Sequence, residues 1–211
     1  MKNLLLLLFI LLIPILGYSL FLTVVQIDFT AQHIQFFFGA VIISIIIHYY
    51  RTRKKPSFFA TFEHELTHNI WALFTFNKPA GFHINNDGTG MFEYYGKSNF
   101  LQMLGPYVTL TISYILIPFY YILIEPARPY YFLVLGLATG YHTASTIKET
   151  GFFQTDIKRQ GYLFSMVFII IGNIFSYGLL LAFVINRHTG MWEFLNTGFI
   201  QAWELLQVLR P

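Results

Sequence analysis

The sequence contains no cysteine and little charge, because only 11% of its 211 residues are Asp, Glu, Lys or Arg. The absence of cysteine excludes disulfides, thiolate nucleophiles and cysteine-ligated metals, so any metal must be held by His, Asp or Glu. Soluble domains carry about 25% charged residues, since their surface faces water. The shortage of charge, together with 55% hydrophobic residues, therefore excludes a soluble domain and predicts a surface that faces lipid.

Long apolar runs fill most of the chain. A membrane-spanning helix needs about 20 mostly apolar residues, and about six segments approach this length: residues 4–25, 34–50, 57–76, 99–124, 130–147 and 161–185. Lys2 ahead of a Leu-rich run is also typical of a signal peptide, but the apolar run continues for a full membrane thickness, which favours an uncleaved span. The predicted fold is an all-α polytopic membrane protein with about six transmembrane helices.

The chain is expected to form a single membrane-embedded domain over residues 1–211. Residues 1–56 would form two accessory spans, residues 57–185 a catalytic core, and residues 186–211 a tail. In the tail, the spacing of the apolar residues predicts a C-terminal amphipathic helix, which either lies at the membrane interface or packs on the helix bundle.

Basic residues report on topology and partners. Four of them cluster between the second and third apolar segments: Arg51, Arg53, Lys54 and Lys55. A cluster between spans is a membrane-topology signal, and the sequence has no basic stripe of the kind that binds nucleic acid. The expected surroundings are therefore the lipid bilayer and other membrane proteins, with no nucleic acid.

The segment at residues 57–76 contains ionisable residues that a spanning helix normally excludes, because each is costly in lipid unless it is paired or bound. His64, Glu65 and His68 form the pattern His-Glu-x-x-His. Two imidazoles four residues apart share one helix face and can bind one zinc ion, while the glutamate can act as the general base on a bound water. The motif predicts one Zn²⁺ per chain and hydrolysis of a peptide bond with Glu65 as the catalytic base. Glu63 points off this face and receives no role.

A catalytic zinc needs a third protein ligand and an open fourth position. The chain offers six candidates for that ligand: His48, His83, Glu93, His142, Glu149 and Asp156. The motif lies at mid-span or beyond when counted from the side of the membrane that holds the N-terminus, so the third ligand should come from the opposite side or from mid-helix. His48 lies near the N-terminal side and is therefore disfavoured. Residue chemistry leaves Asp156, His142 and His83 open.

Residues 81–96 form the longest weakly apolar region, and Asp87-Gly88 within it is a turn signal between β-compatible residues. The region predicts a β-hairpin, which is either an exposed loop or a short membrane-associated element.

Three features in order along the chain resemble the site-2 protease family of intramembrane zinc metalloproteases, in particular its small bacterial branch without a PDZ domain. They are Phe62-Glu63-His64-Glu65-Leu66-Thr67-His68 in a span, Leu104-Gly105-Pro106 in a span after the hairpin, and Gln154-Thr155-Asp156-Ile157 at a polar-to-apolar junction. The last segment departs from the Asn-Pro-Asp-Gly form of better-known branches.

The resemblance implies that His64, His68 and Asp156 bind zinc and that Glu65 is the general base. It also implies a multi-pass protein of a bacterial cytoplasmic membrane, and a hairpin whose open edge pairs with an unwound segment of a membrane protein substrate. Substrate selection is then expected from the hairpin, from the membrane or from a regulatory membrane partner.

Two hypotheses from different classes remain. The first is an intramembrane zinc endopeptidase that cleaves in or near a transmembrane segment of another protein. The second is a non-enzymatic membrane protein that binds metal, transports metal or acts as a scaffold, as the seven histidines and the missing substrate-selecting domain suggest. Glu65 discriminates them, because hydrolysis needs a general base and metal transport does not. The side of the membrane that the site faces stays open, because the charge distribution and the resemblance favour opposite sides.

Overall fold

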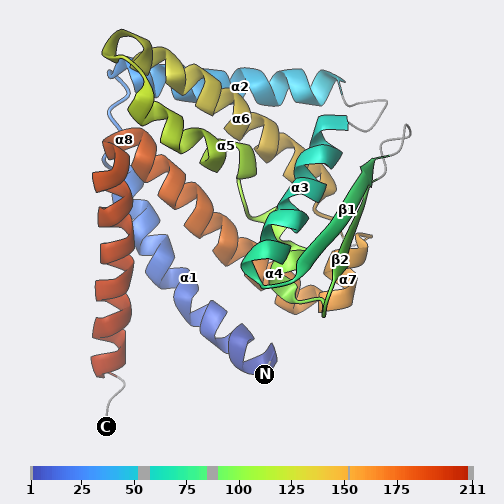
Figure 1. Cartoon of the computed structure of the whole chain (residues 1–211). Helices are drawn as coiled ribbons and strands as arrows, with labels where there is room; N and C mark the ends of the chain where they lie inside the picture. Colours follow the sequence, from blue (N-terminus) through green and yellow to red (C-terminus); the bar gives the residue numbers. More distant parts are fainter. Residues whose placement is uncertain (1, 52–57, 85–89, 152, 209–211) are drawn as a thin grey trace.

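A computed structural model describes residues 2–51, 58–84, 90–151 and 153–208 (Figure 1). The chain is mostly helical and has one two-stranded sheet among these residues. The elements in order are α1 (Lys2–Val24), α2 (Gln32–Arg51), α3 (Phe58–Phe74), β1 (Lys78–Ile84), β2 (Gly90–Tyr95), α4 (Phe100–Leu104), η1 (Gly105–Tyr107), α5 (Thr111–Leu116), η2 (Ile117–Ile122), η3 (Glu125–Ala127), α6 (Arg128–Glu149), α7 (Thr155–Gln160) and α8 (Tyr162–Val208). The expected Asp87-Gly88 turn and most of the basic cluster, Arg53 to Lys55, lie outside the described residues.

Within the described ranges, three helices are long and apolar enough to cross a membrane, namely α1, α2 and α8. The count rises to four if the segments 100–107 and 111–122, which are bent by 84° at a short break, form one span. Residues 99–124 are thus a broken element and not the single spanning helix that the sequence predicts. The helix α3 has 17 residues, slightly fewer than a full span needs.

Side chains from other helices bind this break, one at a side-chain hydroxyl and one at a backbone carbonyl. Trp71 of α3 donates its indole N–H to Thr109 Oγ1 at 2.9 Å, and Asn173 of α8 donates to the Tyr107 carbonyl at 2.9 Å. Irregular backbone is tolerated at membrane depth only where the protein supplies such partners. The apolar composition of residues 99–124 predicts that the segment is buried. The break within it depends on side chains that are distant in the sequence.

Two helix pairs organise the molecule, since α1 lies along α8 and α2 lies along α6 (Figure 1). The α2–α6 pair is close, because a Cβ at Gly136 or Gly140 would collide with backbone carbonyl oxygens of α2. Ser44 of α2 also donates to the Leu137 carbonyl at 2.7 Å. Helices in lipid usually pack through small residues that let the two backbones approach, and through hydrogen bonds from side-chain hydroxyl groups across the pair.

A sharp break divides α8 at Asn186 and Arg187, where Arg187 adopts a positive φ of 58°. Its guanidinium donates to the Phe183 carbonyl at 3.2 Å and lies 4.3 Å from the Phe132 ring centroid, so it binds a carbonyl near the end of the first part of the helix. After the break the first part of the tail contacts the C-terminal half of α1, where Gly198 lies close to Leu16 and Ser19, and the tail then diverges from α1 (Figure 1). The break coincides with the predicted start of the tail at residue 186, and the first part of the tail packs on the bundle.

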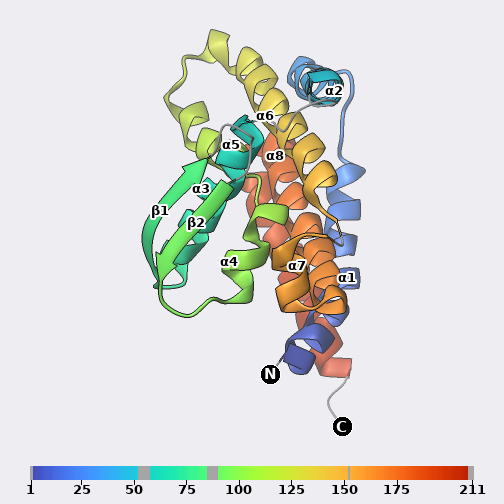
Figure 2. The same ribbon diagram turned by 90° about the vertical axis from the view of Figure 1, so that its right-hand side faces the viewer.

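The predicted hairpin is confirmed as the antiparallel pair β1–β2. It lies against α3, on the opposite side of the molecule from the α8 tail (Figure 1), and α4 lies between its lower end and α7 (Figure 2). Among the described residues, no third strand pairs with either of its outer edges.

Candidate metal centre

The helix α3 has polar residues on two different faces. His64, Glu65 and His68 line a cavity of about 550 Å³, as expected for positions i, i+1 and i+4 on one side of a helix. Glu63 and Thr67 are buried on another side, against α5 and α6. The His-Glu-x-x-His motif therefore faces a cavity, and Glu63 points away from it as the helical spacing predicts.

The cavity-facing histidines meet an aspartate that is far away in the sequence. His68 Nε2 lies 3.6 Å from Asp156 Oδ2, and His64 Nε2 lies 3.9 Å from the same oxygen. One ligand atom from each of the three residues lies within 4.8 Å of the others. Ligand atoms around a tetrahedral zinc ion are separated by about 3.4 Å, given Zn–N and Zn–O bonds of about 2.1 Å. The three side chains are thus close to a metal-binding arrangement.

Asp156 lies in the first turn of the short helix α7. The next residue, Ile157, is fully buried in a hydrophobic cluster with Leu104 and Phe164, which holds α7 against α4 and α8. Burial alone would raise the pKa of Asp156, but the neighbouring His64 and His68 outweigh this effect and hold the pKa below its usual range. The carboxylate is therefore anionic, which is the form that could hold a metal ion.

The other candidates for a third ligand lie elsewhere. His142 is buried against Glu63, whereas His83 and Glu93 are exposed on the hairpin. His48 lines the cavity but is not part of the cluster of ligand atoms. Of the three residues that chemistry left open, the structure brings only Asp156 to the motif.

The catalytic candidate Glu65 is buried beside strand β2. A Cβ at Gly90 would lie 2.5 Å from Glu65 Oε1, so only a glycine lets the strand approach the carboxylate this closely. Further along β2, the Phe92 ring stacks on His68 with the ring centroids 5.5 Å apart and the planes 7° apart. The strand thus forms one wall of the cavity next to the candidate base.

Both histidines use their second ring nitrogen for a contact inside the protein. His64 Nδ1 lies 3.2 Å from Glu149 Oε2, and His68 Nδ1 lies 2.6 Å from the Gln102 carbonyl oxygen. Partners of this kind fix the ring orientation of metal-binding histidines. Sequence reasoning missed the contact with Gln102, although Asn99-x-x-Gln102 is a readable capping-box pattern that predicts a helix start there.

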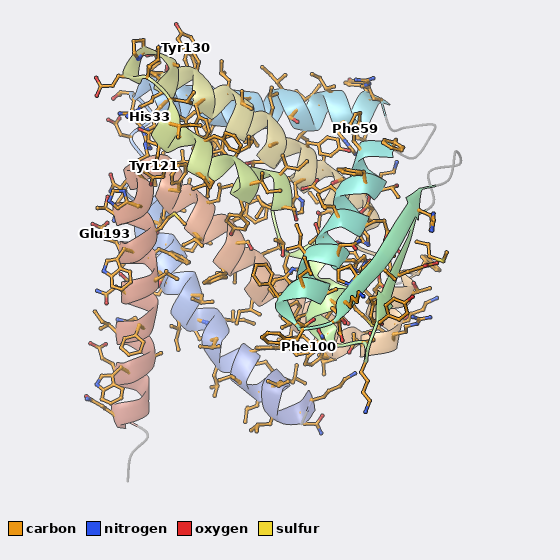
Figure 3. All side chains as sticks on the ribbon, viewed as in Figure 1. His33, Phe59, Phe100, Tyr121, Tyr130 and Glu193 are labelled. Atoms are coloured by element: carbon orange, nitrogen blue, oxygen red, sulfur yellow. The ribbon has the colours of Figure 1, made fainter. Side chains whose placement is uncertain are left out.

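The helix α4, which provides the Gln102 carbonyl, is anchored at its start. Asn99 caps it by accepting from Gln102 N at 3.0 Å, while Gln102 Oε1 accepts from Asn99 N at 3.1 Å. Phe100, labelled in Figure 3, packs in an aromatic cluster with Phe9 and Phe164, with ring centroids 6.1 and 5.4 Å away. The cap and the cluster together fix the carbonyl that His68 contacts.

A second polar cluster lies on the other face of α3. Glu63 Oε1 and His142 Nδ1 are 3.2 Å apart, and both side chains are 4% exposed. His142 Nε2 also lies 3.2 Å from Thr146 Oγ1, and Thr67 contacts the Thr111 hydroxyl. The pair is shielded from solvent and joins α3 to α6.

Comparison of the chain with family models, curated proteins and solved structures gives no match. The function of the chain must therefore be inferred from its residues and their geometry.

Proposed function

We propose that the protein is an intramembrane zinc endopeptidase that hydrolyses a peptide bond in or near a transmembrane segment of another membrane protein. The observation that supports this proposal is the convergence of ligand atoms from His64, His68 and Asp156 within 4.8 Å, with Glu65 beside them on the wall of a cavity. Two imidazoles, one carboxylate and an adjacent glutamate are the residue types of a hydrolytic zinc site.

The ligand set fits zinc better than the hard cations. Mg²⁺ and Ca²⁺ prefer six or more oxygen ligands, whereas this cluster offers two imidazole nitrogens and one carboxylate oxygen. Three protein ligands next to a cavity leave a fourth position accessible, as catalytic zinc sites require. Bound zinc would supply a Lewis acid and lower the pKa of a water molecule at that position.

In this proposal, Glu65 acts as the general base and then as the general acid. Its carboxylate accepts a proton from the attacking water and delivers it to the nitrogen of the leaving amine, so the products are a carboxylic acid and an amine. Burial beside Gly90 holds the carboxylate in place.

The hairpin is suited to present the substrate. A helical segment hides its peptide bonds within its own hydrogen bonds, so it must become extended before hydrolysis. The strand β2 lines the cavity and has an outer edge without a described strand partner, and a substrate segment could pair with that edge. This arrangement supports a membrane protein as the substrate, with a regulatory membrane partner as a possible source of selectivity.

The proposal includes six membrane crossings in a bacterial cytoplasmic membrane. The three apolar helices and the bent pair provide up to four crossings. The helices α3 and α6 would provide the other two, with their polar residues buried inside the protein.

The test uses purified full-length chain in liposomes together with a pool of synthetic transmembrane peptides. We expect about one zinc per chain by elemental analysis, and cleavage products by mass spectrometry. Glu65→Gln should retain zinc and lose cleavage. Glu193→Gln, on the tail, is the matched control and should retain both.

Two results would contradict the proposal. Full cleavage by Glu65→Gln would exclude this glutamate as the base. Zinc uptake into the liposomes that survives Glu65→Gln, without cleavage in any form, would favour the metal-transporting alternative, and a chain without zinc would favour a scaffold.

A further inference from the structure

The two ring nitrogens of His64 face different carboxylates. Nε2 faces Asp156 Oδ2 at 3.9 Å, within the group of ligand atoms. Nδ1 faces Glu149 Oε2 at 3.2 Å, which is hydrogen-bond distance. Because Nδ1 and Nε2 lie on opposite edges of the imidazole, a metal bound at Nε2 is remote from Glu149. Glu149 is therefore poorly placed to be a ligand itself.

The helix α6 holds Glu149 in a fixed place. Glu149 is its last residue, and His142 lies seven positions earlier, so both side chains share one face of the helix. That face contacts α3 twice, through His142 with Glu63 and through Glu149 with His64. Gly136 and Gly140 pack the same helix closely on α2. The carboxylate thus projects from the last turn of a helix that packs on both α2 and α3.

We propose that Glu149 is a positioning residue for the metal centre, an inference that rests on the zinc site proposed above. Its carboxylate accepts the Nδ1–H of His64, which selects the tautomer with a free lone pair on Nε2. The same bond fixes the plane of the ring, so that Nε2 faces the point where His68 and Asp156 converge. Outer partners of this kind typically change metal affinity by about 10- to 100-fold when they are removed.

The role predicts a graded response at position 149. Glu149→Ala removes the acceptor, so Zn²⁺ should bind about 10- to 100-fold more weakly, with about one ion per chain still bound at saturation. Glu149→Gln keeps a carbonyl oxygen that can accept the same hydrogen bond, so it should recover most of the affinity. Ile147→Ala, an exposed neighbour in the last turn of α6, is the control and should bind like the native chain.

The experiment titrates Zn²⁺ against a competing chelator with the full-length chain in detergent, and records the visible spectrum of the Co²⁺ form. We expect the Glu149→Ala spectrum to differ from the native one, and the Glu149→Gln spectrum to resemble it. Unchanged affinity and spectrum in Glu149→Ala would overturn the inference while leaving the zinc site intact. Complete loss of metal in both variants would overturn it in favour of Glu149 as a ligand. A native chain that binds no zinc would instead refute the proposed function, and this inference with it.

Discussion

Two polar clusters lie at different faces of α3, and each combines histidine with a carboxylate, but they differ in geometry. The metal cluster consists of His64, His68 and Asp156, whose ligand atoms converge next to a cavity. The buried pair consists of Glu63 and His142, one acid and one base that contact each other at 3.2 Å. Three ligands with an accessible side suit a metal ion. The shielded pair offers only one imidazole and one carboxylate, and it uses Glu63 Oε1 alone, since Glu63 Oε2 has no partner among the described residues.

The difference shows why adjacent residues have different roles. Glu63 and His64 are neighbours in the sequence, yet a rotation of about 100° per residue directs them to different surroundings. The buried pair joins α3 to α6 through the contact between Glu63 and His142. Glu63 Oε1 also lies 3.5 Å from the Ile112 backbone N–H, just after the break in the chain, so the pair supports the irregular segment as well.

The largest expected effect is on zinc affinity, which a substitution in the metal cluster should lower much more than a substitution in the buried pair. Asp156→Ala removes one of the three proposed ligands, so Zn²⁺ affinity should fall by more than about 100-fold, which exceeds the usual effect of an outer partner. His142→Leu leaves all three ligands in place and should change the affinity by less than about tenfold. Chelator competition on both purified variants measures the contrast. If His142→Leu lost as much affinity as Asp156→Ala, the two clusters would be one functional unit.

The free energy of unfolding should show the opposite contrast, with the larger loss at the buried pair than at the metal cluster. His142→Leu leaves the Glu63 carboxylate buried without its partner, and removing one member of a buried pair typically costs about 3–5 kcal/mol. The double variant Glu63→Met with His142→Leu removes both polar groups and should recover much of that loss. Denaturant titration in mixed micelles, followed by circular dichroism, measures the free energy of unfolding. Equal losses in the single and double variants would show that the pair does not act as a pair.

A third change affects catalysis at the metal cluster without removing a ligand. A Cβ at Gly90 would press on the Glu65 carboxylate, so Gly90→Ala should displace the base. A displacement of about 1 Å can reduce turnover by about 100-fold, and zinc stoichiometry should stay unchanged. Gly81→Ala in the neighbouring strand β1 is the matched control, because its Cβ would meet nothing within 4 Å. Equal activity of the two variants would mean that β2 does not constrain Glu65.

The sequence predicts the histidine pair and the apolar helices well, because both depend on local spacing. The hairpin and the end of the long helix before residue 186 are also readable, from a turn signal and from the end of an apolar run. The break within residues 99–124 is not readable in this way. It depends on two side chains of other helices: Trp71, which binds the Thr109 hydroxyl, and Asn173, which binds the Tyr107 carbonyl.

The same limit applies to the metal centre. Residue chemistry left Asp156, His142 and His83 as open choices, since the distance between α3 and α7 is a property of the tertiary fold. The role of Glu149 depends on which nitrogen of His64 it contacts, and the contact to His68 comes from a backbone carbonyl, a group that every residue has. Local pattern therefore predicts the motif, and packing determines its partners.

The smallest expected effect concerns the support of His68. Asn99→Ala removes the cap of α4 and should lower the free energy of unfolding by about 1 kcal/mol. Because α4 carries the Gln102 carbonyl that contacts His68 Nδ1, zinc affinity should fall a few-fold as well. Asn77→Ala removes a side-chain bond to the Lys97 carbonyl in the same region and is the control, with a similar loss of stability and unchanged zinc affinity. If both variants weakened zinc equally, general loosening of the hairpin region would explain the effect, and the α4 cap would have no specific connection to the metal cluster.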